Sequence, residues 1–290
     1  IGIVLPYLVP LLVIMSLLED TGLLPRIAFM MDGILHRFGL HGKSVIPILL
    51  GYGCNVPAIM AARNLEYERD RIITLLIVPF ISCSARSVIV FALAGRYLGP
   101  LYTTLIYLGN VGIAFSLSLI LSRISADLSP GIIMDVPPLR RPYFSVVMKK
   151  VWANLVDFLV FAWPVIAVSS IILAFLSYAG IDNVINSLFS PITEGILRLP
   201  QELGITLFYG IFRKELTLVM LNSALNTHDI ASALTPDQIL VLVVFSVLYI
   251  PCIATITALW KEGGWKVACS SMLLNTTVAI AVAGGIAYLI

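Results

Sequence analysis

The sequence has 290 residues, of which 59% are hydrophobic and only 12% are charged. A soluble domain carries about twice that share of charged residues, so the composition excludes an ordinary soluble domain and predicts an all-α polytopic membrane protein. The net charge of +2, without a basic patch containing interleaved aromatic residues, argues against nucleic-acid binding. Four cysteines without paired short spacing argue against a disulfide scaffold or a structural zinc site.

Six apolar stretches are close to the length that a bilayer requires, which is about 20 residues. They lie at residues 2–18, 71–97, 100–122, 156–178, 238–259 and 266–289. Two further apolar segments, 44–63 and 204–222, are interrupted by Gly, Pro, Asn or charged residues, which predicts broken or re-entrant helices. The chain begins with Ile rather than Met, which indicates a processed product or a fragment.

The first broken segment contains one informative octapeptide, Gly51-Tyr52-Gly53-Cys54-Asn55-Val56-Pro57-Ala58. Backbone that leaves the helix at membrane depth is tolerated only where it lines a cavity or is packed in protein. A thiol and an amide on such a break, at Cys54 and Asn55, are typical of an ion or substrate site. The alternative is a loop with a buried cysteine that only packs.

A second pattern, aromatic-Ile-x-Cys-x-Ala, occurs twice in the chain. It is present as Phe80-Ile81-Ser82-Cys83-Ser84-Ala85 and as Tyr249-Ile250-Pro251-Cys252-Ile253-Ala254. Repetition at matching places in two halves predicts a duplicated transporter fold with its binding site near the membrane midplane. Cys54, Cys83 and Cys252 are therefore predicted to form a sparse thiol-lined path. Cys269 lies outside these motifs and is predicted to serve packing.

The order of elements also repeats, as a span, an amphipathic stretch, a broken segment, a Cys-bearing span and a further span. Three spans in each half is an odd number, so the second half must insert upside down relative to the first. This predicts two inverted repeats, residues 1–123 and 156–290, joined by a cytoplasmic or interfacial linker at 124–155.

Lys and Arg residues concentrate in the connecting segments that this topology places on one side of the membrane. Those segments are 19–71, 123–155 and 260–266, and the positive-inside rule predicts that they are cytoplasmic.

Charged and imidazole side chains within the apolar segments are the remaining candidates. Arg86 lies inside a span and is expected to pair with Glu215 or with carbonyl groups at a helix C-terminus. Glu215 is a candidate cation ligand, and the alternative is an internal ion pair with Lys214 or Arg213. The amide of Asn275 is expected to bond across helices. The three histidines, His36, His41 and His228, are isolated in the sequence and predict no metal site.

Taken together, these motifs resemble the membrane domain of the ferrous-iron transport protein B (FeoB) family. Besides the octapeptide and the two cysteine motifs, the resemblance includes Glu68-Arg69-Asp70-Arg71, Gly210-Ile211-Phe212-Arg213-Lys214-Glu215 and Trp260-Lys261-Glu262-Gly263-Gly264-Trp265-Lys266. The two broken segments correspond to the paired Gate regions of that family, which are shared more loosely with nucleoside transporters.

The resemblance implies transport of ferrous iron into the cytoplasm through the inner or plasma membrane of a prokaryotic cell. Fe²⁺ would be the transported substrate, and the expected ligands are Cys54, Cys83, Cys252, Asn55 and Glu215. The alternative is a nucleoside or other small-solute carrier of the same Gate type. The sequence offers no nucleophile–base set or His-rich metal motif, so a transporter rather than an enzyme is expected.

The resembled family usually carries an N-terminal GTPase domain. This chain has no G-x-x-x-x-G-K-S/T phosphate loop, so GTP is expected to act only through a domain outside it. Membrane lipid and a cytoplasmic GTPase domain or small accessory protein are the expected partners, and homo-oligomer formation is left open.

Overall fold

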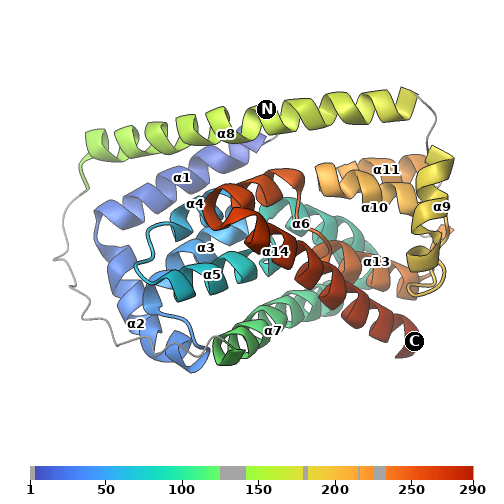
Figure 1. Ribbon diagram of the computed structural model, residues 1–290, viewed down its shortest axis with the longest axis horizontal. Helices are drawn as coiled ribbons and strands as arrows, with labels where there is room; N and C mark the ends of the chain where they lie inside the picture. Colours follow the sequence, from blue (N-terminus) through green and yellow to red (C-terminus); the bar gives the residue numbers. More distant parts are fainter. Residues whose placement is uncertain (1–3, 125–141, 179–181, 215, 225–232, 290) are drawn as a thin grey trace. The chain divides into compact units, whose positions relative to one another are not determined.

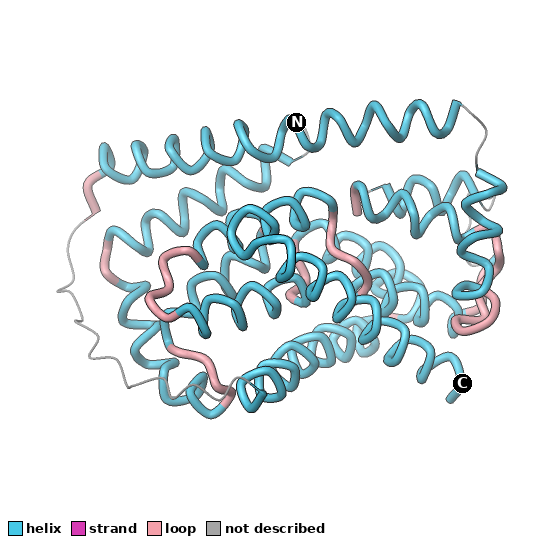
Figure 2. Tube along the Cα trace, viewed as in Figure 1, coloured by secondary structure: helices cyan, strands magenta, loops and turns pink. Residues whose placement is uncertain are grey.

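In the computed structural model of the protein, the described residues are 4–124, 142–178, 182–214, 216–224 and 233–289. They form helices joined by loops and turns, and none of the described residues is in a β-strand (Figure 2). The prediction of an all-helical protein is confirmed.

The chain clusters into two compact units that alternate along the sequence. Unit 1 comprises Ile1–Cys83, Gly112–Pro164 and Ala258–Val267. Unit 2 comprises Ser84–Val111, Val165–Thr257 and Ala268–Ile290.

Three helical stretches among the described residues are long and apolar enough to cross a membrane, and they are Glu68–Leu98, Pro100–Ile124 and Pro236–Leu289. The first two contain the predicted spans 71–97 and 100–122, whereas the third contains both 238–259 and 266–289. Two shorter apolar helices are Trp163–Leu173 and Leu203–Phe212. The chain is therefore a membrane protein by its helix lengths and composition.

Unit 1 is built mainly from the first part of the chain (Figure 1). Its first elements are α1 (Val4–Asp20), α2 (Leu23–Arg37), η1 (Gly42–Ser44), α3 (Val45–Gly53), α4 (Asn55–Ala62), α5 (Glu68–Ile77) and η2 (Val78–Phe80). It also contains the second half of α7 (Pro100–Ile124) and the first part of α8 (Phe144–Tyr178).

Helix α2 shows how the sequence determines a local structure in this unit. Leu24, Ala28 and Leu35 recur at helical spacing and are buried on one face of the helix. The helix ends because Gly39 adopts a left-handed conformation with φ of 72°. The backbone N–H of Leu40 then reaches back to the Leu35 carbonyl at 3.0 Å, which caps the helix and turns the chain toward η1.

Gly42, at the start of η1, packs directly against α2. A Cβ atom at this position would overlap the backbone carbonyl of Ala28, and the Gly42 N–H donates to Asp32 Oδ1 at 2.6 Å. We expect Gly42→Ala to destabilise the protein by about 1–3 kcal/mol, because the helix backbone has to move. Thermal unfolding of the purified protein in detergent measures this effect.

Gly33→Ala is the matched control for Gly42→Ala, because Gly33 lies within α2 and a Cβ atom added there would meet nothing within 4 Å. Its open helical position predicts a gain of about 1 kcal/mol from helix propensity. Equal melting temperatures for the two variants would contradict close packing at Gly42.

Unit 2 contains the remaining elements. They are α6 (Ser84–Ile89), the π-helix η3 (Val90–Leu98), α9 (Asp182–Thr193), α10 (Leu203–Phe212), α11 (Leu216–Ala224), α13 (Pro236–Leu248) and both ends of α14 (Ile253–Leu289), whose stretch Ala258–Val267 belongs to unit 1. Helix α13 starts at a capping box in which Thr235 and Gln238 bond reciprocally, with Pro236 in the first turn. All its residues from Val241 to Leu248 are buried, so α13 forms the core of this unit and packs against η3.

Helix α14 contains a kink at Gly264, whose φ of 80° and ψ of 170° are not helical. The kink falls between the predicted spans 238–259 and 266–289, next to the exposed side chains of Trp260 and Trp265. The kink at Gly264 therefore separates the two spans that the sequence predicts in this part of the chain.

Candidate functional site

The first helix break lies at Cys54, between α3 and α4. Cys54 has an extended backbone, with φ of −152° and ψ of 130°, and its N–H still donates to the Leu50 carbonyl at 3.0 Å. Helix α4 restarts at once with Asn55, and Pro57 occupies its first turn, where a missing N–H costs nothing. The predicted broken segment 44–63 is thus a pair of short helices interrupted at a single residue.

Two glycines allow close packing at this break. Gly51 is buried against the side chain of Ile81, and a Cβ atom on Gly53 would overlap the side chain of Leu11. The octapeptide therefore uses its glycines for close approach and places its thiol at the interruption.

Asn55 is only 4% exposed, yet its side-chain oxygen Oδ1 has no hydrogen-bond partner among the described residues. A buried polar group without a partner costs about 1–3 kcal/mol, so it requires an explanation in a native fold. An amide oxygen next to a helix break can coordinate a cation.

The second break, at Arg213, has the same backbone form as the first. Arg213 lies between α10 and α11 with φ of −145° and ψ of 116°, and its N–H donates to the Tyr209 carbonyl at 3.1 Å. Counting from each break, Lys214 occupies the position that Asn55 occupies in the first segment, and it is similarly buried, at 5% exposure. The predicted segment 204–222 is therefore also interrupted, and its predicted ligand Glu215 lies outside the described residues.

The two aromatic-Ile-x-Cys motifs also fold alike. Cys83 immediately precedes α6 and Cys252 immediately precedes α14, each after a short stretch that has left the preceding helix. Both thiols are partly buried, and Cys252 Sγ lies 3.1 Å from Thr255 Oγ1. The matching sequences thus mark matching helix starts.

The cysteines are distributed over both compact units. Cys54 and Cys83 belong to unit 1 and Cys252 belongs to unit 2, so a path shared by the three thiols stays a prediction. Cys269, which the sequence predicts to serve packing, is exposed on α14.

Arg86 is almost completely buried and binds a carbonyl group at a helix C-terminus, which is one of the two partners predicted for it. Its Nη2 donates to the carbonyl of Tyr249, the C-cap residue of α13, at 3.0 Å. Lys214 Nζ donates to the Ser246 carbonyl of the same helix end at 3.3 Å and lies 5.4 Å from the centre of the Tyr249 ring. Both cations meet the negative end of the α13 dipole, where carbonyl groups lack partners within the helix.

A histidine cluster in unit 1 corrects the expectation that the histidines are isolated. His41 Nε2 lies 3.4 Å from Asp70 Oδ2, and His41 Nδ1 lies 3.9 Å from Asp32 Oδ1. The rings of His36 and His41 have centroids 5.8 Å apart, whereas His228 lies outside the described residues. Through His41, the cluster connects Asp32 of α2 with Asp70 of α5. The described part of the chain contains no group of three His, Cys, Asp or Glu side chains that could hold a metal ion.

Asn275 also differs from its expectation. Its Nδ2 donates to the carbonyl and to the hydroxyl oxygen of Ser271, one turn earlier in α14, at 2.8 and 3.3 Å. The amide therefore bonds within its own helix rather than across helices.

Comparison with known proteins identifies two family models along the chain. Residues 1–97 and 159–266 match the Gate model, described as nucleoside recognition, and residues 103–154 match the model for the C terminus of ferrous iron transport protein B. No solved structure matches the chain significantly.

Curated relatives are similar over most of this chain. It is 35% identical to a protein named Fe(2+) transporter FeoB of Methanocaldococcus jannaschii, over 96% of this chain and 46% of the relative. It is 32% identical to proteins of the same name from Staphylococcus aureus, over 90% of this chain and 43% of the relative. It is also 32% identical to the protein of that name from Synechocystis, over 93% of this chain and 46% of the relative. The chain thus spans less than half the length of these relatives. The Gate model covers most of the sequence, and the model for the C terminus of ferrous iron transport protein B matches the residues between its two stretches. The chain therefore belongs to the ferrous-iron transport protein B family, as a membrane domain of the Gate type.

Proposed function

We propose that this chain transports ferrous iron across the membrane, with the ion passing the helix break at Cys54. Its relatives include proteins named Fe(2+) transporter FeoB, and the alignments with them cover 90% or more of this chain. The observation that carries the proposal is the buried Oδ1 of Asn55, which has no hydrogen-bond partner among the described residues and adjoins a thiol on a broken helix.

The chemistry of these side chains suits Fe²⁺. This ion is intermediate in softness, so thiolate sulfur and amide or carbonyl oxygen are all acceptable ligands. A transport site must bind strongly enough to replace the water of the ion but weakly enough to release it. A sparse set formed by Cys54, Cys83, Cys252 and the Asn55 oxygen meets both conditions, and Glu215 is the fifth proposed ligand.

Two inverted repeats are the proposed frame for this path, with broken helices that re-enter and meet near the membrane midplane. The Gate model matches one stretch in each half, and the breaks at Cys54 and Arg213 have the same backbone form. The two breaks differ in charge, because Lys214 stands where the first break has Asn55. A buried ammonium group repels Fe²⁺, so the first break is the proposed main binding position, and the second break contributes Glu215 as a ligand.

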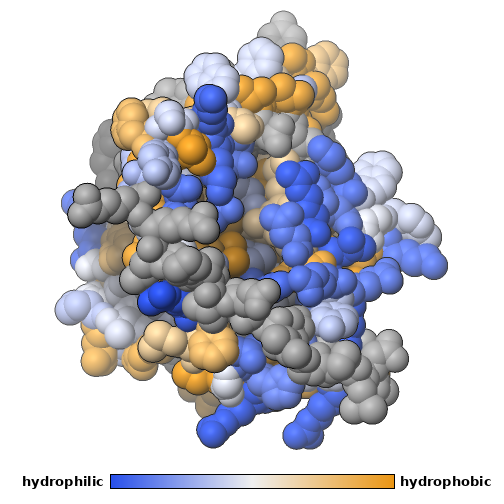
Figure 3. Space-filling model, turned by 90° about the vertical axis from the view of Figure 1, so that its left-hand side faces the viewer, coloured by the Kyte–Doolittle hydropathy of each residue, from blue (hydrophilic) through white to orange (hydrophobic). Residues whose placement is uncertain are grey.

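The proposed location is the inner or plasma membrane of a prokaryotic cell, with the basic connecting segments in the cytoplasm. Figure 3 shows the face that carries α2 and the first turns of α8, on which many hydrophilic side chains, in blue, gather. Apolar side chains, in orange, also lie on this face, which includes parts of the segments 19–71 and 123–155 for which the charge distribution predicts the cytoplasm.

Uptake into proteoliposomes that contain the purified chain tests the proposal. We expect Fe²⁺ to accumulate faster than Mn²⁺, Zn²⁺ or a nucleoside, and empty liposomes give the background. Accumulation of the nucleoside without metal uptake would overturn the proposal and support the small-solute carrier of the same fold.

A separate prediction concerns GTP, which we expect the 290-residue chain neither to bind nor to hydrolyse. Gly42-Lys43-Ser44 imitates the end of a phosphate loop, but Arg37 stands where the first glycine is required. In the structure these residues form the short turn η1, and the Gly42 N–H is already bound to the carboxylate of Asp32 at 2.6 Å. A carboxylate at that place excludes phosphate, because both are anions.

Binding of a fluorescent GTP analogue and release of inorganic phosphate measure this prediction. Nucleotide turnover by the purified chain above a buffer control would contradict it. GTP is proposed to act through a further cytoplasmic domain, or with a small accessory protein, at the basic segments near 64–71 and 139–152.

A further inference from the structure

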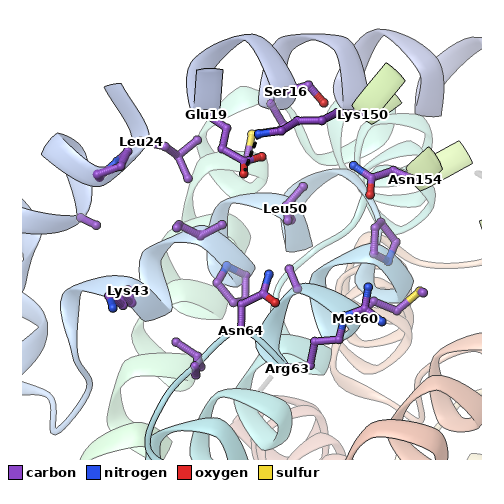
Figure 4. Close-up of a pocket in the computed structure, with 18 of the residues that line it drawn as sticks. Ser16, Glu19, Leu24, Lys43, Leu50, Met60, Arg63, Asn64, Lys150 and Asn154 are labelled. Carbon is purple, nitrogen blue, oxygen red and sulfur yellow. Dashed lines mark hydrogen bonds and ion pairs between the residues drawn. The ribbon is translucent and has the colours of Figure 1, made fainter. Parts of the chain in front are cut away.

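Unit 1 contains a cavity of about 790 Å³ that is lined by α1, α2, α3, α4 and the first part of α8 (Figure 4). Its volume lies in the range of about 300–1,000 Å³ that is typical of ligand sites. Most of the wall is apolar, and its side chains include Leu12, Met15, Leu24, Ile46, Leu50 and Met60. A cavity of this size and polarity suits a hydrocarbon chain.

Five of the residues that line the cavity are charged. Lys150 pairs with Glu19 at 3.1 Å, and Lys43 pairs with Glu66 at 2.6 Å. Arg63 also lines the cavity, is exposed, and has no ion pair among the described residues. These five charged lining residues therefore carry one cation in excess, Arg63, which favours an anionic ligand group.

The start of α8 suits the level of lipid headgroups on the side of the cavity where Lys150 lies. Tyr143, Phe144 and Trp152 are exposed on or beside the first turns of α8, where Lys150 reaches into the cavity. Tyr and Trp next to Lys are typical of the boundary between hydrocarbon and water. We therefore expect the Lys150 side of the cavity to lie near the headgroups.

We propose that this cavity binds one anionic phospholipid, with its phosphate at Arg63 and one acyl chain against α1 and α3. Basic pockets between membrane helices on the cytoplasmic side select anionic headgroups, and an apolar wall of this size is stabilised when hydrocarbon fills it. Leu50 and Met60 lie on the two sides of the break at Cys54, so the bound lipid contacts both arms of the broken helix. The inference does not depend on which solute the chain transports.

Native mass spectrometry of the purified chain in neutral detergent tests the proposal. The chain is titrated with phosphatidylglycerol, with phosphatidylcholine of the same acyl chains, and with glycerol 3-phosphate. We expect phosphatidylglycerol to bind at least about fivefold more tightly than phosphatidylcholine, as one Arg–headgroup contact provides. Equal binding of the two lipids would overturn the proposal, and so would full competition by glycerol 3-phosphate, which would indicate a site for free phosphate.

Two variants and a control connect the binding to this cavity. Arg63→Gln should remove the preference for phosphatidylglycerol, whereas Met15→Trp, which fills the apolar wall, should weaken binding of both lipids. Arg37→Gln is the control, because Arg37 is exposed in the last turn of α2 and does not line the cavity. Equal loss of the preference in Arg63→Gln and Arg37→Gln would show an unspecific charge effect and overturn the site.

Discussion

Replacing Cys54, Cys83 or Cys252 by Ser should lower the initial rate of Fe²⁺ uptake into proteoliposomes at least about tenfold, as loss of a metal contact typically does. Serine has nearly the volume of cysteine, so packing at these partly buried positions changes little. Its hydroxyl stays protonated at neutral pH and is a poor ligand for a metal that accepts thiolate. Each variant should therefore fold and reconstitute as the parent chain does, and melting temperatures in detergent check this.

Cys269→Ser is the matched control, because Cys269 is exposed on α14 and lies outside both cysteine motifs. Its uptake rate should equal that of the unmodified chain. Equal transport by all four variants would assign the thiols to packing. The backbone carbonyls released at the helix breaks would then become the better candidates for the conducting site.

The positions of the helix breaks could be predicted because their causes are local. Pro57 cannot continue a helix from the preceding turn, and Gly51 and Gly53 permit the close packing that an interruption requires. The structure places the first interruption at Cys54, inside the predicted segment. Similarly, the repeated aromatic-Ile-x-Cys pattern predicts two equivalent helix starts, and Cys83 and Cys252 each directly precede a helix.

Side-chain partners could not be predicted in the same way, because they depend on turns and on residues distant in sequence. His41 meets Asp70 only after the chain has turned at Gly39 and α5 has packed against η1. For Arg86, sequence reasoning left two partners open, and the Tyr249 carbonyl is 163 positions away along the chain. The structure also reveals that the Asn55 side-chain oxygen has no hydrogen-bond partner among the described residues, which no pattern in the sequence indicates.

Asn55→Leu should strongly reduce Fe²⁺ uptake, at least about tenfold, while the melting temperature stays the same or rises. Leucine has a shape close to that of asparagine and carries no polar atom. The substitution therefore removes a buried oxygen that lacks a hydrogen-bond partner among the described residues, and with it a cost of about 1–3 kcal/mol. Loss of transport with a gain of stability is the pattern of a residue that is retained for ligand binding at the expense of the fold.

Asn275→Leu provides the comparison, because Asn275 is also fully buried and its Oδ1 also lacks a partner among the described residues. In contrast to Asn55, its Nδ2 donates to the Ser271 carbonyl at 2.8 Å, so the substitution removes an existing hydrogen bond of about 1 kcal/mol. We expect Asn275→Leu to leave the uptake rate unchanged and to lower the melting temperature relative to Asn55→Leu. If Asn55→Leu instead lost stability and transport together while Asn275→Leu lost neither, Asn55 would be a structural residue of the break. The proposed ion position beside Cys54 would then be wrong.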